Sequence, residues 1–186
     1  MLGAQQHGHM DAVGYDMYLK LLNEAILEEK GETPSNVSEE CLIDIKVSAH
    51  IPNSYIDDNT QRIEAYRKIA LIKNDIDVMD VTDELIDRYG EPPSEVGLLI
   101  GVALLRNLSL KAGIVSISQK TDFAVIEFKN PNLEVLSRTA SQFKRELLLS
   151  VSPKPYLSLK IKEGDDILSK LNDIVSYMCE IKKEVK

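Results

Sequence analysis

The chain has few of the residues that hold small secreted domains together or that bind metals. Its 186 residues include two cysteines, three histidines and no tryptophan. Cys41 and Cys179 lie far apart and form no C-x-x-C pair, which favours two reduced, buried thiols. A single disulfide between a late helix and an early strand stays open as the alternative. Three histidines are too few for a metal site, and none is expected.

Long apolar segments are also missing. The longest uncharged apolar stretch runs from Val96 to Leu105, about half the length of a membrane-spanning helix. The first ten residues, MLGAQQHGHM, have neither the basic nor the apolar region of a signal peptide. We therefore expect a cytoplasmic protein. Its length predicts one domain, possibly with an appendage.

The motifs that usually carry catalytic chemistry are absent. The chain has no Gly-Lys dipeptide, which excludes a phosphate-binding loop of the G-x-x-x-x-G-K-[ST] type. The patterns G-x-S-x-G, H-E-x-x-H and G-x-G-x-x-G are missing as well. No catalytic residue, cofactor or enzyme activity is expected in this chain. A small hydrolase with an unrecognised acidic site is the weaker alternative, and it would need a buried pair of carboxylates.

Charge is unevenly distributed along the chain. Residues 75–95 carry eight acids against the single base Arg88, whereas residues 106–162 carry ten bases against four acids. The acidic block is typical either of a solvated helix face or of a surface that meets a basic partner. The basic half raises the alternative of a nucleic-acid-binding module. However, few aromatic residues accompany its bases, and Phe123, Phe128 and Phe143 fall where a core would place them, so no base-stacking platform is evident.

Periodicity predicts an α+β fold, with helices packed around a small antiparallel sheet. Residues 14–30 have a helical pattern and belong to an N-terminal appendage at 1–30, and the polar residues 31–40 form a linker to the body at 41–186. In the body we expect strands at 41–50, 114–118 and 123–128, and two edge strands interrupted by prolines within 147–162. Helices are expected at 60–73, 78–89, 95–112, 131–143 and from Asp166 onward.

Several stretches together resemble the C-terminal part of the bacterial transcription-repair coupling factors, Mfd, which are ATP-dependent DNA translocases. The resemblance rests on four segments of this sequence: LGAQQHGHMDAVGYDMYLKLL at 2–22, IPNSYIDDNTQRIEAYRKIA at 51–70, DELIDRYGEPP at 83–93 and LKAGI at 110–114. The first looks like the end of a RecG-like translocation motif, of which Gln6, Gly8 and His9 would be the remnant, followed by its connecting helix. The motor, with its ATP and Mg²⁺, would then lie upstream.

The resemblance implies a regulatory role for the chain. In that family the last domain packs against the N-terminal module that recruits the excision-repair protein UvrA. It masks that module until the motor engages stalled RNA polymerase on DNA. The family's contact surface corresponds to Glu84, Asp87 and Arg88 here. This agrees with the acidic block, because residues at positions i and i+3 of a helix lie on one face.

Overall fold

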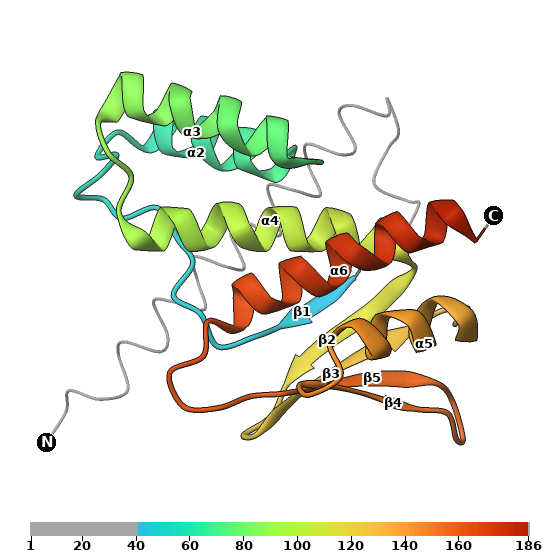
Figure 1. Cartoon of the computed structure of the whole chain (residues 1–186). Helices are drawn as coiled ribbons and strands as arrows, with labels where there is room; N and C mark the ends of the chain where they lie inside the picture. The colour runs from blue at the N-terminus through green and yellow to red at the C-terminus, as the bar shows by residue number, and fades with distance from the viewer. Residues whose placement is uncertain (1–40, 186) are drawn as a thin grey trace, which may run out of the picture. The chain divides into compact units, whose positions relative to one another are not determined.

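The computed structural model of the chain describes residues 41–185, which form two compact units (Figure 1). The first unit comprises Val47–Leu104, and the second comprises residues 41–46 together with 105–185. The predicted appendage at 1–30 and linker at 31–40 lie outside the described residues. No helix within residues 41–185 combines the length and the apolar character needed to cross a membrane.

The first unit contains two helices that pack side by side, α2 (Asn59–Ala70) and α3 (Asp75–Tyr89), and the start of α4 (Ser94–Ala112). Asp58 caps α2 by accepting a hydrogen bond from the Gln61 amide at 2.8 Å, and it is one of three neighbouring residues, Asp57, Asp58 and Asn59, whose side chains can cap a helix. Helix α3 starts three residues earlier than the sequence pattern indicates. Its cap is Asn74, whose Oδ1 accepts from the amides of Ile76 and Asp77.

Both long helices end as their glycines predict. Gly90 ends α3 with φ +83°, and its amide donates to the Ile86 carbonyl at 2.9 Å. Gly113 ends α4 with φ +84°, and its amide donates to the Leu110 carbonyl. A residue with a Cβ is strained at such angles, so glycine is required at both positions.

The second unit is built on one five-stranded sheet with the order β1-β2-β3-β5-β4. Its strands are β1 (Leu42–Asp44), β2 (Ile114–Gln119), β3 (Phe123–Phe128), β4 (Leu147–Ser150) and β5 (Tyr156–Lys160). All neighbouring strands are antiparallel except β1 and β2, which are parallel. The α+β class is therefore confirmed, and the sheet is mixed rather than wholly antiparallel.

One face of this sheet is buried. The strand register places Ile43, Ile117, Ile126 and Leu157 in one row across four strands, and each is at most 3% exposed. In the adjacent row the side chains alternate to the other face, where Leu42 is 61% exposed. Helix α5 (Leu133–Gln142) packs against both β4 and α6 (Ile167–Glu184). Every apolar residue predicted for the last helix is buried: Ile167, Leu168, Leu171, Ile174, Val175, Met178 and Ile181.

Three further local predictions are wrong. The alternating pattern at 41–50 predicts a ten-residue strand, but only Leu42–Asp44 join the sheet, and the Lys46 amide donates to the Gln119 side chain instead. Only β4 of the proline-interrupted pair is an edge strand, because β5 lies between β3 and β4. Phe123, expected in the core, is 42% exposed, whereas Phe128 is buried.

Candidate functional site

Glu84, Asp87 and Arg88 all lie in the second half of α3, on its solvent-accessible side. Leu85 on the opposite side of this turn is buried, which orients the helix. The structure therefore places the three predicted residues within one turn of one helix. They do not have equivalent surroundings.

Glu84 is held by two cations. Its Oε1 accepts a hydrogen bond from Lys68 Nζ on α2, and a second from Arg88 Nη1 at 3.2 Å. These hydrogen bonds and charges lower the pKa of the Glu84 carboxyl, with Lys68 as the main cause. The Arg88 guanidinium also lies 5.1 Å from the centre of the Tyr89 ring, in a cation–π contact. The sequence analysis missed Lys68 and Tyr89 as parts of this cluster.

Asp87 is fully available to a partner. Its side chain is exposed and makes no hydrogen bond or ion pair with any residue in 41–185. It belongs to a row of exposed side chains along α3, which we call the outer face of α3: Ile76, Met79, Asp80, Asp83 and Asp87. Ile76 and Met79 are 65% and 57% exposed. The outer face thus combines unpaired carboxylates with exposed apolar side chains.

A groove runs beside this surface between α2 and α3. It is an open, shallow depression of about 360 Å³, lined by Lys68, Leu71, Ile72, Lys73, Asp77, Asp80, Val81 and Glu84. Leu71 at its rim is 39% exposed. An apolar or cationic side chain of a partner could therefore enter next to Glu84.

Two of the stretches that carry the resemblance are in direct contact. The Tyr55 hydroxyl donates to the Gly90 carbonyl at 2.8 Å, and it also lies 3.3 Å from the Leu85 carbonyl. The Tyr55 and Tyr89 rings pack edge to face with centres 6.0 Å apart. These contacts fix the C-terminal end of α3, and with it the turn that carries Asp87 and Arg88.

The bases of residues 106–162 differ in their surroundings. Arg106 is buried, and Arg138 is paired with Glu134 at 3.0 Å and Glu184 at 3.6 Å. The other eight bases are exposed, among them Lys144, Arg145 and Lys160. The alternative of a nucleic-acid-binding module therefore stays a prediction.

The described residues contain no group of three or more His, Cys, Asp or Glu side chains that could hold a metal ion. Gln6, Gly8 and His9, the predicted remnant of a translocation motif, lie outside the described residues. Cys41 and Cys179 are both free thiols. Burial raises the pKa of Cys41 to about 11.

The structure defines an α+β domain that carries a charged, partly apolar helix surface. The profile of the TRCF domain family matches residues 45–137, and the chain belongs to this family. It is 30% identical to the transcription-repair-coupling factor of Bacillus subtilis (strain 168), over 99% of this chain and 16% of that protein. It is 32% identical to that of Staphylococcus aureus (strain USA300), over 81% of this chain and 13% of that protein.

The fold has a counterpart among solved structures. The crystal structure of the C-terminal domain of a transcription-repair coupling factor superposes with a TM-score of 0.73 at 23% identity, covering 79% of this chain and 96% of that one. The chain itself spans only about a sixth of the length of its Bacillus relative.

Proposed function

We propose that this chain is the non-catalytic regulatory domain of an ATP-dependent DNA translocase that couples transcription to nucleotide-excision repair. In its parent protein it holds the N-terminal UvrA-recruiting module and keeps that module masked. Engagement of stalled RNA polymerase and DNA by the motor releases it. Membership of the TRCF domain family and the resemblance of the chain to transcription-repair-coupling factors support this proposal.

The observation that carries the proposal is the arrangement of charges on α3. The Lys68–Glu84–Arg88 cluster is internally paired and fixes the position of the Arg88 guanidinium. Asp87, next to it, is unpaired within the described residues. A partner arginine that meets Asp87 can form a charge-assisted hydrogen bond without first breaking an ion pair of this domain. Ile76 and Met79 supply apolar contact area further along the same face.

The exposure of these groups suits a contact that must open. Exposed ion pairs contribute roughly 1 kcal/mol or less each, so a few of them hold two domains together reversibly when both belong to one chain. Masking of this kind is a coupling between two states. The domain stabilises the closed state, and polymerase and DNA must stabilise the open state by at least as much.

The test is UvrA binding by the full-length parent protein. Removing residues 41–186 should raise the affinity of the parent protein for UvrA. The double variant Glu84→Ala with Asp87→Ala should raise this affinity as well. Asp173→Ala, an exposed aspartate on α6, is the matched control and should change nothing. Unchanged UvrA binding in the double variant would show that these residues are not the contact.

A further inference from the structure

The two edges of the five-stranded sheet differ in their charge. β1 forms one edge and β4 forms the other, and among residues 41–185 β4 pairs only with β5 (Figure 1). β1 is three residues long and carries the exposed Asp44, and a charge of this kind discourages a further strand from joining an edge. β4 has the sequence LLLS and contains no charged residue. The β4 edge therefore lacks this protection.

Backbone groups of β4 point out of the sheet at this edge. The Lys160 amide donates to the Glu146 carbonyl at 2.7 Å, which makes these residues a hydrogen-bonded pair at the start of the β4–β5 ladder. Hydrogen-bonded and non-hydrogen-bonded pairs alternate along an antiparallel ladder. The backbone N–H and C=O groups of Leu148 therefore point toward β5, and those of Leu149 and Val151 point away from it. A further strand can pair with the outward groups.

The same edge presents apolar side chains. Leu148 is 65% exposed and Val151 is 61% exposed. Because side chains alternate between the two faces of a sheet, a strand added beside β4 would contact Leu148 on one face and Leu149 on the other. The edge thus offers backbone hydrogen bonds together with apolar contacts, the combination that strand addition uses.

Three exposed bases flank β4. Lys144 and Arg145 precede it and Lys154 follows it, and their side chains make no hydrogen bond or ion pair with any residue in 41–185. Glu146, the acid nearest to them in the sequence, is paired with Lys170 at 3.1 Å. Both ends of the edge therefore carry unpaired positive charge.

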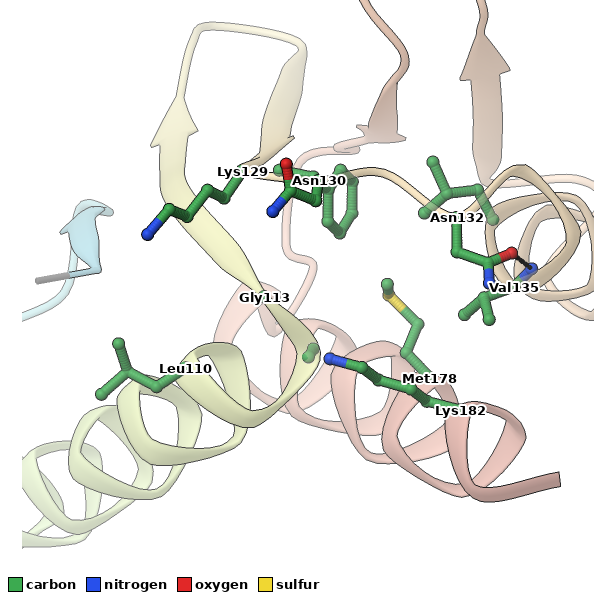
Figure 2. A pocket seen from close by; sticks show the side chains of 11 residues that line it. Leu110, Gly113, Lys129, Asn130, Asn132, Val135, Met178 and Lys182 are labelled. Carbon is green, nitrogen blue, oxygen red and sulfur yellow. Dashed lines mark hydrogen bonds between the residues drawn. The ribbon is translucent and has the colours of Figure 1, made fainter. Parts of the chain in front are cut away.

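Helices α5 and α6 hold β4 and its flanking turn in place. α5 packs on β4, and Asn132 caps α5 by accepting hydrogen bonds from the Glu134 and Val135 amides. Figure 2 shows this cap at the rim of a cavity of about 320 Å³. Phe143, just after α5, packs edge to face on Tyr177 of α6, with ring centres 5.8 Å apart. An edge that is already positioned lowers the entropic cost of binding.

We propose that the β4 edge binds an extended acidic segment of a partner protein, which adds to the sheet as a further strand. Apolar residues in the middle of this segment pack beside Leu148, and acidic residues at its two ends meet Arg145 and Lys154. A second copy of this chain fits less well, because antiparallel pairing of two β4 strands about Leu149 brings Lys144 of one copy near Lys154 of the other. A nucleic acid would neutralise the bases but would leave the outward backbone groups unused.

Amide NMR of the 186-residue chain with a designed peptide tests this proposal. The probe is acetyl-Glu-Glu-Val-Thr-Val-Glu-Glu-amide. The same peptide with two prolines in place of its central Val-Thr is the matched control, because it keeps the charge but lacks the central backbone donors. Single-stranded oligothymidylate is the nucleic-acid control.

The acidic peptide should shift the Leu149 and Val151 amides saturably, with a dissociation constant on the order of 1 mM for a short peptide that is ordered on binding. At about ten times that concentration, hydrogen exchange of the Leu149 amide should slow about tenfold. The Leu148 amide, which points toward β5, should change little. Equal binding of the proline peptide, or no slowing at Leu149, overturns the proposal. Tighter binding of oligothymidylate without slowing at Leu149 assigns the bases to nucleic acid and also overturns it.

Variants of the edge separate strand addition from general charge attraction. Val151→Pro removes an outward amide and should weaken binding of the acidic peptide about fivefold, as expected for one hydrogen bond. Lys154→Met should weaken it by a similar factor, and it leaves every backbone bond of the sheet intact. Lys46→Met changes an exposed base beside β1, at the opposite edge, and should have no effect. Weakening by Lys46→Met equal to that by Lys154→Met would overturn the proposal.

Discussion

Lys68 on α2 donates a hydrogen bond to Glu84 on α3, and this pair joins the two helices of the first unit. Glu84 is therefore both a predicted contact residue and a structural residue. Arg88, one turn later, binds the same carboxylate oxygen and contacts the Tyr89 ring. Variants at these positions must be interpreted with their effect on the domain itself in mind.

Replacing Glu84 by glutamine should make the domain less stable, by an amount that depends on pH. The folded state lowers the pKa of Glu84 below its ordinary value of 4.5, so the ion pairs stabilise the fold above that pH and lose their effect as the pH falls through the folded pKa. Because the side chain is 38% exposed, we expect a loss of about 0.5 kcal/mol at pH 7, and a smaller loss as the pH falls below 4.5. Urea unfolding of both proteins over a series of pH values from 7 downward measures the difference in the free energy of unfolding. A difference that does not change with pH would contradict the assignment.

Replacing Asp87 by alanine should leave stability unchanged within about 0.5 kcal/mol, because its side chain is exposed and unpaired within the described residues. The same change should weaken binding of the UvrA-recruiting module. Asp87→Ala is thus the variant that tests the contact with the UvrA-recruiting module without changing the stability of the domain. A fall in the melting temperature of more than a few degrees would mean that Asp87 has a structural role.

Asn74 positions α3, and its replacement by alanine should destabilise the domain by about 1 kcal/mol through loss of the helix cap. Asn53 is exposed and outside any helix, so Asn53→Ala serves as the control. Thermal unfolding monitored by circular dichroism provides the comparison. Equal changes in the melting temperature for Asn74→Ala and Asn53→Ala would show that the cap contributes nothing to the stability of the domain.

The two cysteines should react at different rates. Cys41 is buried with a pKa of about 11, so it is a neutral, inaccessible thiol at pH 8. Cys179 is partly exposed, although burial raises its pKa as well. Iodoacetamide followed by peptide mass spectrometry should find Cys179 modified first and Cys41 modified only on unfolding. Early modification of Cys41 would contradict its burial.

Helix boundaries were largely predictable, because local signals set them. The caps Asp58 and Asp166 each lie in a short run of residues that commonly cap helices, and Gly90 and Gly113 end α3 and α4. The start of α3 was missed because Ile76, the apolar residue of its first three, is 65% exposed and the buried-face pattern begins only at Val78. That turn depends on the Asn74 side chain rather than on hydrophobic burial.

Sheet order and the surroundings of the site could not be read from the sequence, because both depend on contacts between distant residues. Proline near β5 suggested an edge strand, but Pro153 and Pro155 lie in the connection and leave β5 free to pair with both β3 and β4. In the same way, the spacing of Glu84 and Asp87 predicted a common helix face. The pairing with Lys68 requires α2 to pack on α3, which no local pattern reveals.

The most direct test of the account is a titration of this chain against the isolated UvrA-recruiting module at low and high salt, repeated with the two joined by a flexible linker. The account predicts binding that weakens as salt rises, weakens by up to about fivefold with Asp87→Ala and is unchanged with Asp173→Ala. The linked form keeps the test sensitive if the contact needs the high effective concentration of one chain. A binding affinity that changes neither with salt nor with Asp87→Ala would contradict the proposed masking role. An absence of binding even in the linked form would also contradict it.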